Sequence, residues 1–207
     1  MSATGNSLVP SESCSTRSKF LDDQNAPVGL AVEVNGVPLD DHLAVVSVTC
    51  ESTLGEDSTA EIVLDLAEVS SWCKPGSDLN ILLGYGDELV TAFSGTVESI
   101  TLHCDINGIR TSINGRSAVA FPAPSEPLTL TLGEDVYSYE RTWSGNENPR
   151  GFGQVTFGGQ PDVFPGMNLN VKGVDPVFSG AALVVSVTHR LASGDWTTSA
   201  ELKEMAS

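Results

Sequence analysis

Basic residues are scarce in this sequence, and their scarcity excludes one large class of functions. Ten lysines and arginines stand against twenty-seven aspartates and glutamates, so the 207-residue chain has a formal net charge of −17. Proteins bind duplex DNA largely through cations that displace counterions from the phosphates, and a surface this acidic repels the phosphates instead. Duplex binding is therefore disfavoured. The charge is typical both of a solvated acidic surface and of a functional one, and composition does not separate the two.

Cysteines are also few, and their spacing argues against a metal site. Cys14, Cys50, Cys73 and Cys104 form no C-x-x-C pair, and no histidine stands beside them at a ligand interval. We therefore predict no metal and no cofactor. Cys50 and Cys104 lie in alternating apolar segments where a small buried thiol packs well, which favours reduced core cysteines in a cytoplasmic protein. A bridge between Cys50 and Cys104 stays open as an alternative.

Long apolar runs are absent as well. No segment approaches the ~18 apolar residues that a spanning helix needs, and the start of the chain lacks the basic-then-apolar order of a signal peptide. We therefore expect a soluble protein made in the cytoplasm.

The sequence contains no recognisable catalytic constellation. Four acid pairs could serve a glycosidase, but each lies beside a turn, where solvated charge is the simpler explanation, and adjacent strand residues point to opposite faces. These pairs are Asp40-Asp41, Glu56-Asp57, Asp87-Glu88 and Glu134-Asp135. Ser94 and Ser179 stand between Phe and Gly rather than in a G-x-S-x-G elbow. We predict no catalytic residue.

Two further patterns resemble binding sites without completing them. The run from Asp105 to Gly108 begins like a calcium loop, but position 114 is Asn where a bidentate Glu is required, so a hairpin turn is predicted. The histidines His42, His103 and His189 are isolated, and each stands in or beside a predicted strand. An interface or core-edge position is expected for them rather than metal ligation.

Short β-branched runs separated by turn pairs predict a nearly all-β chain. Strands are expected at 28–34, 45–50, 59–66, 79–83, 89–93, 96–105, 109–113, 154–157, 167–171, 181–189 and 196–202. One or two helical turns are predicted within 64–72, because Leu66, Val69 and Trp72 share a helical face. The domain prediction is a flexible tail at 1–27, a first β-barrel domain at 28–118, a connector at 119–152 and a second, smaller β domain at 153–207.

The two predicted domains repeat one pattern. KPGSDLNILLGYGDELVTAFSGTVESI, beginning at Lys74, and FPGMNLNVKGVDPVFSGAALVVSVTH, beginning at Phe164, share Pro-Gly, Leu-Asn and Phe-Ser-Gly in the same order. Pro-Gly predicts a type II turn that starts a strand, and Phe-Ser-Gly predicts a kink or bulge that lets a sheet curl. The repeat signature is Pro75, Gly76, Phe93, Ser94, Gly95, Pro165, Gly166, Phe178, Ser179 and Gly180. We therefore predict two tandem tube-like β-barrel domains related by internal duplication.

A wider series of motifs surrounds this signature. The first half carries Val32–Gly36, Ser58–Asp65, Pro75-Gly76, Leu82–Gly86 and Phe93–Val97 in order; the second carries Pro165-Gly166, Phe178–Gly180, Val187–His189 and Gly194–Thr197. This series resembles the phage baseplate hub family, which includes the late control protein D group and the amino-terminal part of the VgrG spike proteins. The match runs from about Val32 to Glu204.

The resemblance implies a structural subunit rather than an enzyme. It implies a homotrimer whose six similar units adapt a six-fold tail tube to a three-fold spike, in a contractile phage tail or a tail-like injection system. The implied partners are the tail tube protein, a spike protein and other baseplate proteins, with DNA or an effector passing through the channel unbound. Assembly would take place in the host cytoplasm and end in the tail baseplate. An acidic channel wall would repel a DNA backbone and let it slide.

This chain is shorter than typical members of that family, with only about residues 118–152 between the two predicted barrels. We therefore expect a minimal hub whose piercing tip is a separate protein, and a tube-initiator or adaptor ring protein is the nearest alternative. A second alternative is a carbohydrate-binding β-sandwich that presents Trp143 and Trp196 in its loops. The enzyme alternative predicts glycan cleavage that depends on an acid pair.

Overall fold

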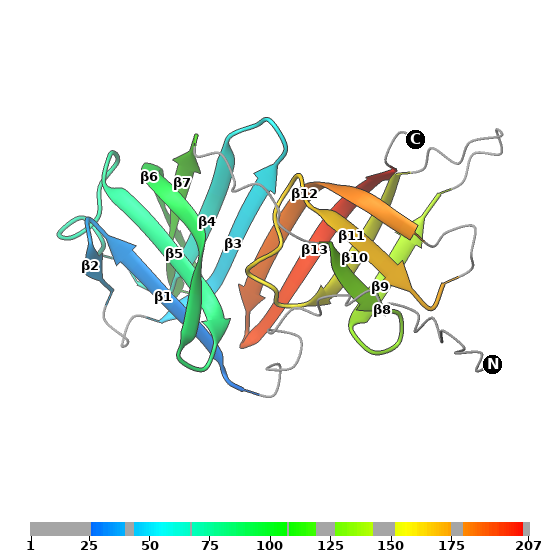
Figure 1. Cartoon of the computed structure of the whole chain (residues 1–207). Helices are drawn as coiled ribbons and strands as arrows, with labels where there is room; N and C mark the ends of the chain where they lie inside the picture. The colour runs from blue at the N-terminus through cyan, green and yellow to red at the C-terminus, as the bar shows by residue number, and fades with distance from the viewer. Residues whose placement is uncertain are drawn as a thin grey trace, which may run out of the picture.

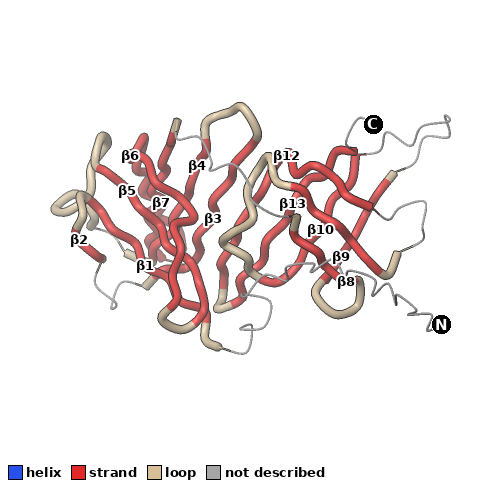
Figure 2. The backbone as a smooth tube through the Cα atoms, viewed as in Figure 1, coloured by secondary structure: helices blue, strands red, loops and turns tan. Residues whose placement is uncertain are grey.

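The structure, a computed structural model, describes residues 26–39, 44–66, 68–106, 108–118, 127–142, 152–174 and 180–204. These residues form thirteen strands and no helix (Figures 1 and 2). The strands are β1 (Val28–Val34), β2 (Val37–Pro38), β3 (Val45–Thr53), β4 (Ser58–Leu64), β5 (Asp78–Tyr85), β6 (Glu88–Asp105), β7 (Gly108–Ser117), β8 (Leu128–Thr131), β9 (Val136–Arg141), β10 (Phe152–Gly158), β11 (Asn168–Lys172), β12 (Gly180–Ala192) and β13 (Asp195–Glu204). The all-β prediction is confirmed. Within this part of the chain, no helix is long and apolar enough to cross a membrane.

All thirteen strands belong to one open sheet. Its order is β2-β1-β5-β6-β7-β4-β3-β12-β13-β10-β9, while β11 pairs with β12 and β8 pairs with β11. Every pair is antiparallel except β8 with β11. The described strands therefore form one open sheet, and the predicted pair of tandem barrels is not confirmed.

Each half of the sheet surrounds its own apolar core, since alternate residues of the strands turn inward. The first core contains Val48, Ile62, Leu79, Ile81 and Ile113. The second contains Leu130, Val155, Phe157, Leu169 and Val184. Trp196 of β13 belongs to the first core although its strand lies in the second half of the sheet. A residue of the second half therefore packs into the core of the first half.

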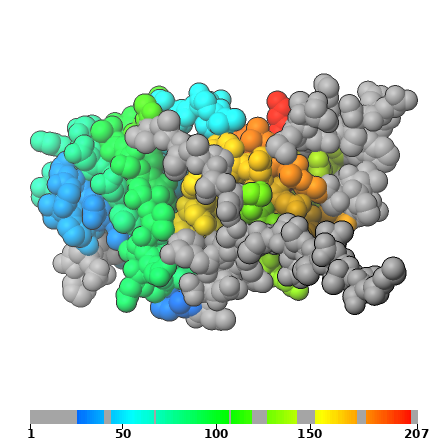
Figure 3. All heavy atoms as spheres, viewed as in Figure 1, coloured from blue at the N-terminus to red at the C-terminus, as the bar shows by residue number. Residues whose placement is uncertain are grey.

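A single strand, β12, joins the two halves. Its first residues pair with β11, and its last seven, from Ser186 to Ala192, pair with β3. Beside this ladder, the turn after β3 is attached to the second half, because the Leu54 N–H donates to the Val185 carbonyl at 2.8 Å. In Figure 3 the cyan turn of the first half lies against yellow and orange segments of the second.

The structure differs from the predicted elements in three places. The segment predicted as a connector contains β8 and β9, and both pair with strands of the second half. The predicted strands 89–93 and 96–105 are one continuous strand, β6. The predicted helical turns shrink to one turn, in which the Val69 carbonyl accepts from the Trp72 and Cys73 N–H groups at 3.1 and 2.9 Å. Of the predicted tail, residues 1–25 lie outside the described residues.

Candidate functional site

Both Pro-Gly pairs form type II turns, as predicted. Gly76 and Gly166 have φ values of 88° and 93°, a conformation that suits glycine at the third position of this turn. The turns are closed by the Ser77 N–H donating to the Lys74 carbonyl at 3.0 Å and by the Met167 N–H donating to the Phe164 carbonyl at 3.4 Å. The two segments therefore have the same local backbone structure.

The two turns also dock on the following strand in the same way. In the first half, the Gly76 N–H donates to the Val97 carbonyl and the Val97 N–H to the Ser77 carbonyl, each at 2.8 Å. In the second half, the Gly166 N–H donates to the Val184 carbonyl at 2.8 Å and the Val184 N–H to the Met167 carbonyl at 2.9 Å. Val97 of β6 and Val184 of β12 therefore occupy matching positions.

The correspondence extends across five strands. The order β5-β6-β7-β4-β3 in the first half has the same pairings as β11-β12-β13-β10-β9 in the second. Register shifts also recur at matching places. One follows Val97 in β6 and Val184 in β12, and another follows Val45 in β3 and Val136 in β9. Because a bulge is a specific local feature, two shared bulges are stronger evidence that the halves repeat one structure than strand order alone.

The Phe-Ser-Gly motifs do not keep this correspondence. Gly95 precedes Val97 by two residues, whereas Gly180 precedes Val184 by four. A Cβ on Gly95 would overlap the Arg116 carbonyl oxygen, but Gly180, with a φ of 118°, would meet nothing within 4 Å. Phe178 and Ser179 lie outside the described residues. The glycines of the two motifs thus meet different structural requirements.

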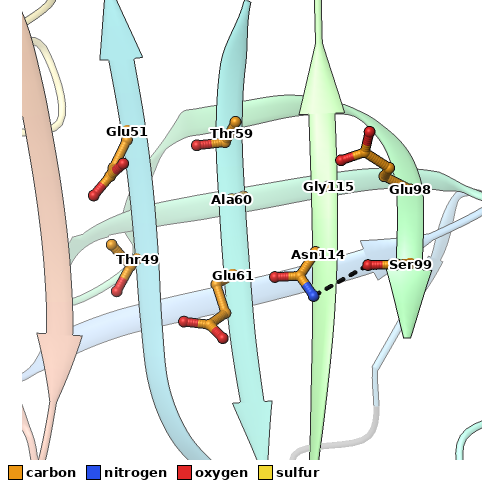
Figure 4. A pocket seen from close by; sticks show the side chains of 9 residues that line it. All are labelled: Thr49, Glu51, Thr59, Ala60, Glu61, Glu98, Ser99, Asn114 and Gly115. Atoms are coloured by element: carbon orange, nitrogen blue, oxygen red, sulfur yellow. Dashed lines mark hydrogen bonds between the residues drawn. The ribbon is translucent and has the colours of Figure 1, made fainter. Parts of the chain in front are cut away.

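The face of the sheet opposite the cores carries polar side chains in both halves, and we call it the polar face. They include Thr49, Glu61 and Asn114 in the first half and Glu140, Gln154 and Glu201 in the second. In the first half, a shallow hollow of about 360 Å³ opens on it over β3, β4, β7 and β6 (Figure 4). Glu51, Glu61 and Glu98 border it, and the Asn114 side-chain amide donates to Ser99 Oγ at 3.3 Å. Arg116 lies beside this group, with its Nε 3.5 Å from a Glu98 carboxylate oxygen.

A second hollow of about 370 Å³ lies on the polar face in the second half, bordered by Glu140, Thr142, Gly153, Gln154 and Glu201. Its three strands, β9, β10 and β13, correspond to β3, β4 and β7 of the first hollow, whereas β12, the counterpart of β6, does not line it. Gln154 pairs with Glu201 and Glu140, as Glu61 pairs with Asn114 and Thr49. The polar face therefore carries a depression with glutamates in each half, although the glutamates stand at different positions of the repeat.

The predicted acid pairs stand apart from these hollows, with one exception. Asp57 of the Glu56-Asp57 turn lies 4.0 Å from Arg116, whereas Asp87 and Glu134 lie in other turns. Asp135 is buried and accepts the Thr131 N–H at 2.9 Å. Asp40-Asp41 lies outside the described residues. Within the described ranges, no three histidine, cysteine or acidic side chains are grouped to hold a metal ion.

The histidines occupy contrasting positions. His103 is exposed on β6, 3.6 Å from Asp105. His189 of β12 is buried and lies 3.0 Å from Thr198 Oγ1 through its Nδ1 atom. Burial lowers the pKa of His189 to about 4, although a hydrogen bond with the Val163 backbone opposes this shift. His42 lies beyond the described part of the chain.

Trp196, which the carbohydrate-binding alternative needs on the surface, is 4% exposed. It packs against Tyr85 of the first half instead, with ring centroids 5.2 Å apart. Trp143 falls outside the described residues. The structure thus leaves the carbohydrate-binding alternative without one of its two aromatic residues.

Cys50, Cys73 and Cys104 are free thiols, so no bridge joins Cys50 to Cys104. Cys50 is buried as expected, and burial raises its pKa to about 12; Cys73 is also buried. The expected burial of Cys104 is wrong, because this residue lies on the end of β6 that extends beyond its pairing with β5.

Comparison with known proteins gives a match in structure but none in sequence. No family model matches the chain, and no curated protein matches it. A tail protein from Neisseria meningitidis MC58 has a TM-score of 0.63 at 9% identity, covering 86% of this chain and 96% of its own. A tail protein of prophage MuSo2 from Shewanella oneidensis has a TM-score of 0.60 at 8% identity, covering 86% and 97%.

A third similar structure comes from a secretion system. It is an E. coli component of the type VI secretion system, described as similar to the T4 bacteriophage tail proteins gp27 and gp5. Its TM-score is 0.62 at 10% identity, covering 84% of this chain and 77% of its own. At these identities the likeness establishes the fold alone. The chain therefore has the fold of phage and type VI secretion tail proteins.

Proposed function

We propose that this chain is a structural subunit of the baseplate hub in a contractile phage tail or a related injection system. The observation that carries the proposal is the repeated pairing of five strands, with shared turns and shared bulges, in a fold that phage tail proteins also have. Two copies of one curled-sheet unit per chain let three chains present six similar units. A homotrimer could then match a six-fold tube on one side and a three-fold spike on the other.

The polar face would form the channel wall in such a ring. Both hollows are lined by glutamates, so the wall would repel nucleic acid and hold neither DNA nor a protein effector tightly. The partners on either side would be a tail tube protein and a spike protein, with other baseplate proteins around them. Assembly in the host cytoplasm and a final place in the tail follow from that role, as does action without catalysis. An adaptor ring that starts the tube would use the same geometry.

The experiment that tests the proposal is the mass of the purified protein in solution, alone and with its tail tube partner. A monomer has a mass of 21.7 kDa, and the proposal expects three times that mass, together with rings in negative-stain images. A protein that stays monomeric at high concentration and with the tube partner would contradict it. Clear hits on a glycan array, or glycan cleavage that is lost when an acid pair is neutralised, would favour the binding or enzyme alternatives.

A further inference from the structure

Among the described residues, the second half of β6 has only one partner strand. From Ser99 to Cys104 it pairs with β7, while its pairing with β5 ends at Thr96. No strand among the described residues lies along the other edge of this stretch. An uncovered strand edge readily pairs with another chain, and proteins commonly blunt or cover such edges.

The matching segment of β12 is covered. Ser99 of β6 corresponds to Ser186 of β12, because each directly follows the shared bulge. From Ser186 onward, β12 pairs with β3 across the middle of the molecule. The chain thus contains one complete junction between units, β12 with β3, and half of a second.

The missing half is present at the far end of the sheet. β9 corresponds to β3, since both carry the bulge that precedes Ser47 and Ser138. β9 is the last strand of the sheet order, and within the described ranges only β10 pairs with it. Among the strand edges without a partner strand in the described ranges, those of β6 and β9 are therefore the counterparts of the two edges that the internal junction joins, β12 and β3.

Apolar side chains are exposed where the end of β6 pairs with the start of β7. Leu102 and Ile109 are 55% and 42% exposed. Their counterparts in the second half, His189 and Trp196, are 5% and 4% exposed, because the first half of the sheet lies against them. A unit docked on β6 would cover Leu102 and Ile109 in the same way.

We propose that β6 of one copy pairs antiparallel with β9 of a second copy, in the register that β12 keeps with β3. Since Arg190 pairs with Thr49 inside the chain, the same register places His103 opposite Glu140 of the next copy. It also places Leu102 opposite Arg141, whose alkyl stem can cover an apolar side chain, and Cys104 opposite Tyr139. The contact joins different surfaces on the two copies, so it is heterologous, and three such contacts would close the ring of the proposed trimer. This inference rests on the proposed function, which sets the ring at three chains.

The test is cross-linking in the full chain carrying Cys14→Ser and Cys104→Ser. His103→Cys is combined with Glu140→Cys in the test variant, and with Gln154→Cys in the control. Gln154 pairs directly with Glu140 and is exposed on the same polar face, but it lies one strand further from the edge. Directly opposed residues have Cβ atoms about 4.5–5.5 Å apart, so an added strand puts the control thiol beyond disulfide reach. We expect interchain bonds after mild oxidation in the test variant and their loss in the control.

Each outcome separates the junction from the proposed function. A series of cross-linked species that stops at three chains supports both the junction and the trimer. A series that continues past three chains supports the junction and overturns the trimer. A trimer in solution that cross-links equally in both variants, or in neither, overturns the junction and leaves the hub role standing. A monomer without interchain bonds overturns both.

A substitution away from the thiols gives an independent check. Leu102→Lys adds a charge to an exposed edge position opposite Arg141, so the fold should remain intact while the copies separate. We expect the cross-linked band to be lost and the solution mass to fall to that of the monomer. A variant that keeps its oligomer and its cross-link would overturn the proposed register.

Discussion

The ring of Tyr85, at the end of β5, lies 5.2 Å from the ring of Trp196, at the start of β13, with an angle of 34° between their planes. The two residues are 111 positions apart in the sequence and come from different halves of the sheet. The ring of His189 also lies near the tryptophan, with its centroid 6.4 Å away. This aromatic contact, together with the β3–β12 ladder, holds the halves in one arrangement.

Trp196→Ala should destabilise the protein more than most single substitutions. The change leaves a large void in the first core, where β13 of the second half packs into it, and such truncations cost about 3–5 kcal/mol. Equilibrium unfolding in urea measures the loss, and Trp196→Phe serves as the control because it keeps a ring against Tyr85. If the free energy of unfolding of the alanine variant lay within ~0.5 kcal/mol of the parent value, the contact would not stabilise the fold.

Stability should fall in mild acid because of His189. Its pKa is lowered from 6.5 to about 4 in the folded protein, so the unfolded chain binds more protons between these values. The stabilising effect of the neutral ring is complete above pH 6.5 and is lost as the pH falls toward 4. At ~1.4 kcal/mol per pKa unit, the loss is of the order of 3 kcal/mol.

Thermal unfolding between pH 7 and 4 measures this loss, with His189→Gln as the control. The variant should lose part of the pH dependence in that window even if it starts less stable. An unchanged slope would assign the acid sensitivity to other groups.

Thiol reactivity should separate Cys104 from Cys50. Cys104 is exposed, whereas burial raises the pKa of Cys50 to about 12 and leaves little thiolate at neutral pH. In a Cys14→Ser background, a chromogenic disulfide reagent should titrate one thiol quickly, and the remaining two only after denaturation. Cys104→Ser should abolish the fast phase. A fast phase that survived this change would show that a buried cysteine is accessible.

Gly95→Ala should destabilise the sheet through crowding. A Cβ there would overlap the Arg116 carbonyl and stand 2.8 Å from both the Phe93 ring and the Ser117 Cβ. Overpacking of this kind costs about 1–3 kcal/mol. Urea unfolding measures the loss of stability. Thr96→Ala, at the next and exposed position of the strand, is the control for the effect of alanine on strand propensity. Equal effects of the two changes would exclude crowding as the cause.

Charge reversal on the polar face should create an affinity for nucleic acid. The parent protein should not bind a short DNA oligonucleotide, whereas a variant with Glu51, Glu61, Glu140 and Glu201 changed to Lys should bind it in a salt-dependent way. The matched control changes Glu56, Glu68, Asp87 and Glu134 to Lys, which gives the same net charge with the lysines outside the hollows. Equal fluorescence anisotropy for both variants would remove any special role for the polar face.

Local signals predicted much of the fold. The β1 boundaries are as predicted from Val28 to Val34, and Asn35 and Gly36 both have the positive φ of a type I′ turn. Both Pro-Gly turns also follow from residue chemistry. β8 and β9 escaped prediction, because Pro122, Pro124 and Pro127 precede a stretch whose strands are short and gain stability only by pairing with β11 and β10.

The site was harder to read from the sequence than the fold. The hollows depend on which strands are neighbours, and Glu61 and Asn114 are 53 positions apart although they pair directly. The Phe-Ser-Gly motif suggested an alignment of the halves that differs by two residues from the one that the hydrogen bonds define. Backbone pairing and bulges preserve a structural correspondence after side chains have diverged, and neither is visible in a single sequence.

β12 is shared between the two halves, and this has a mechanical consequence. Any bending at the middle of the molecule would have to separate seven paired positions between β12 and β3 at once. The two halves should therefore move as one rigid body rather than bend about a hinge between them. The protein should also unfold in a single cooperative step.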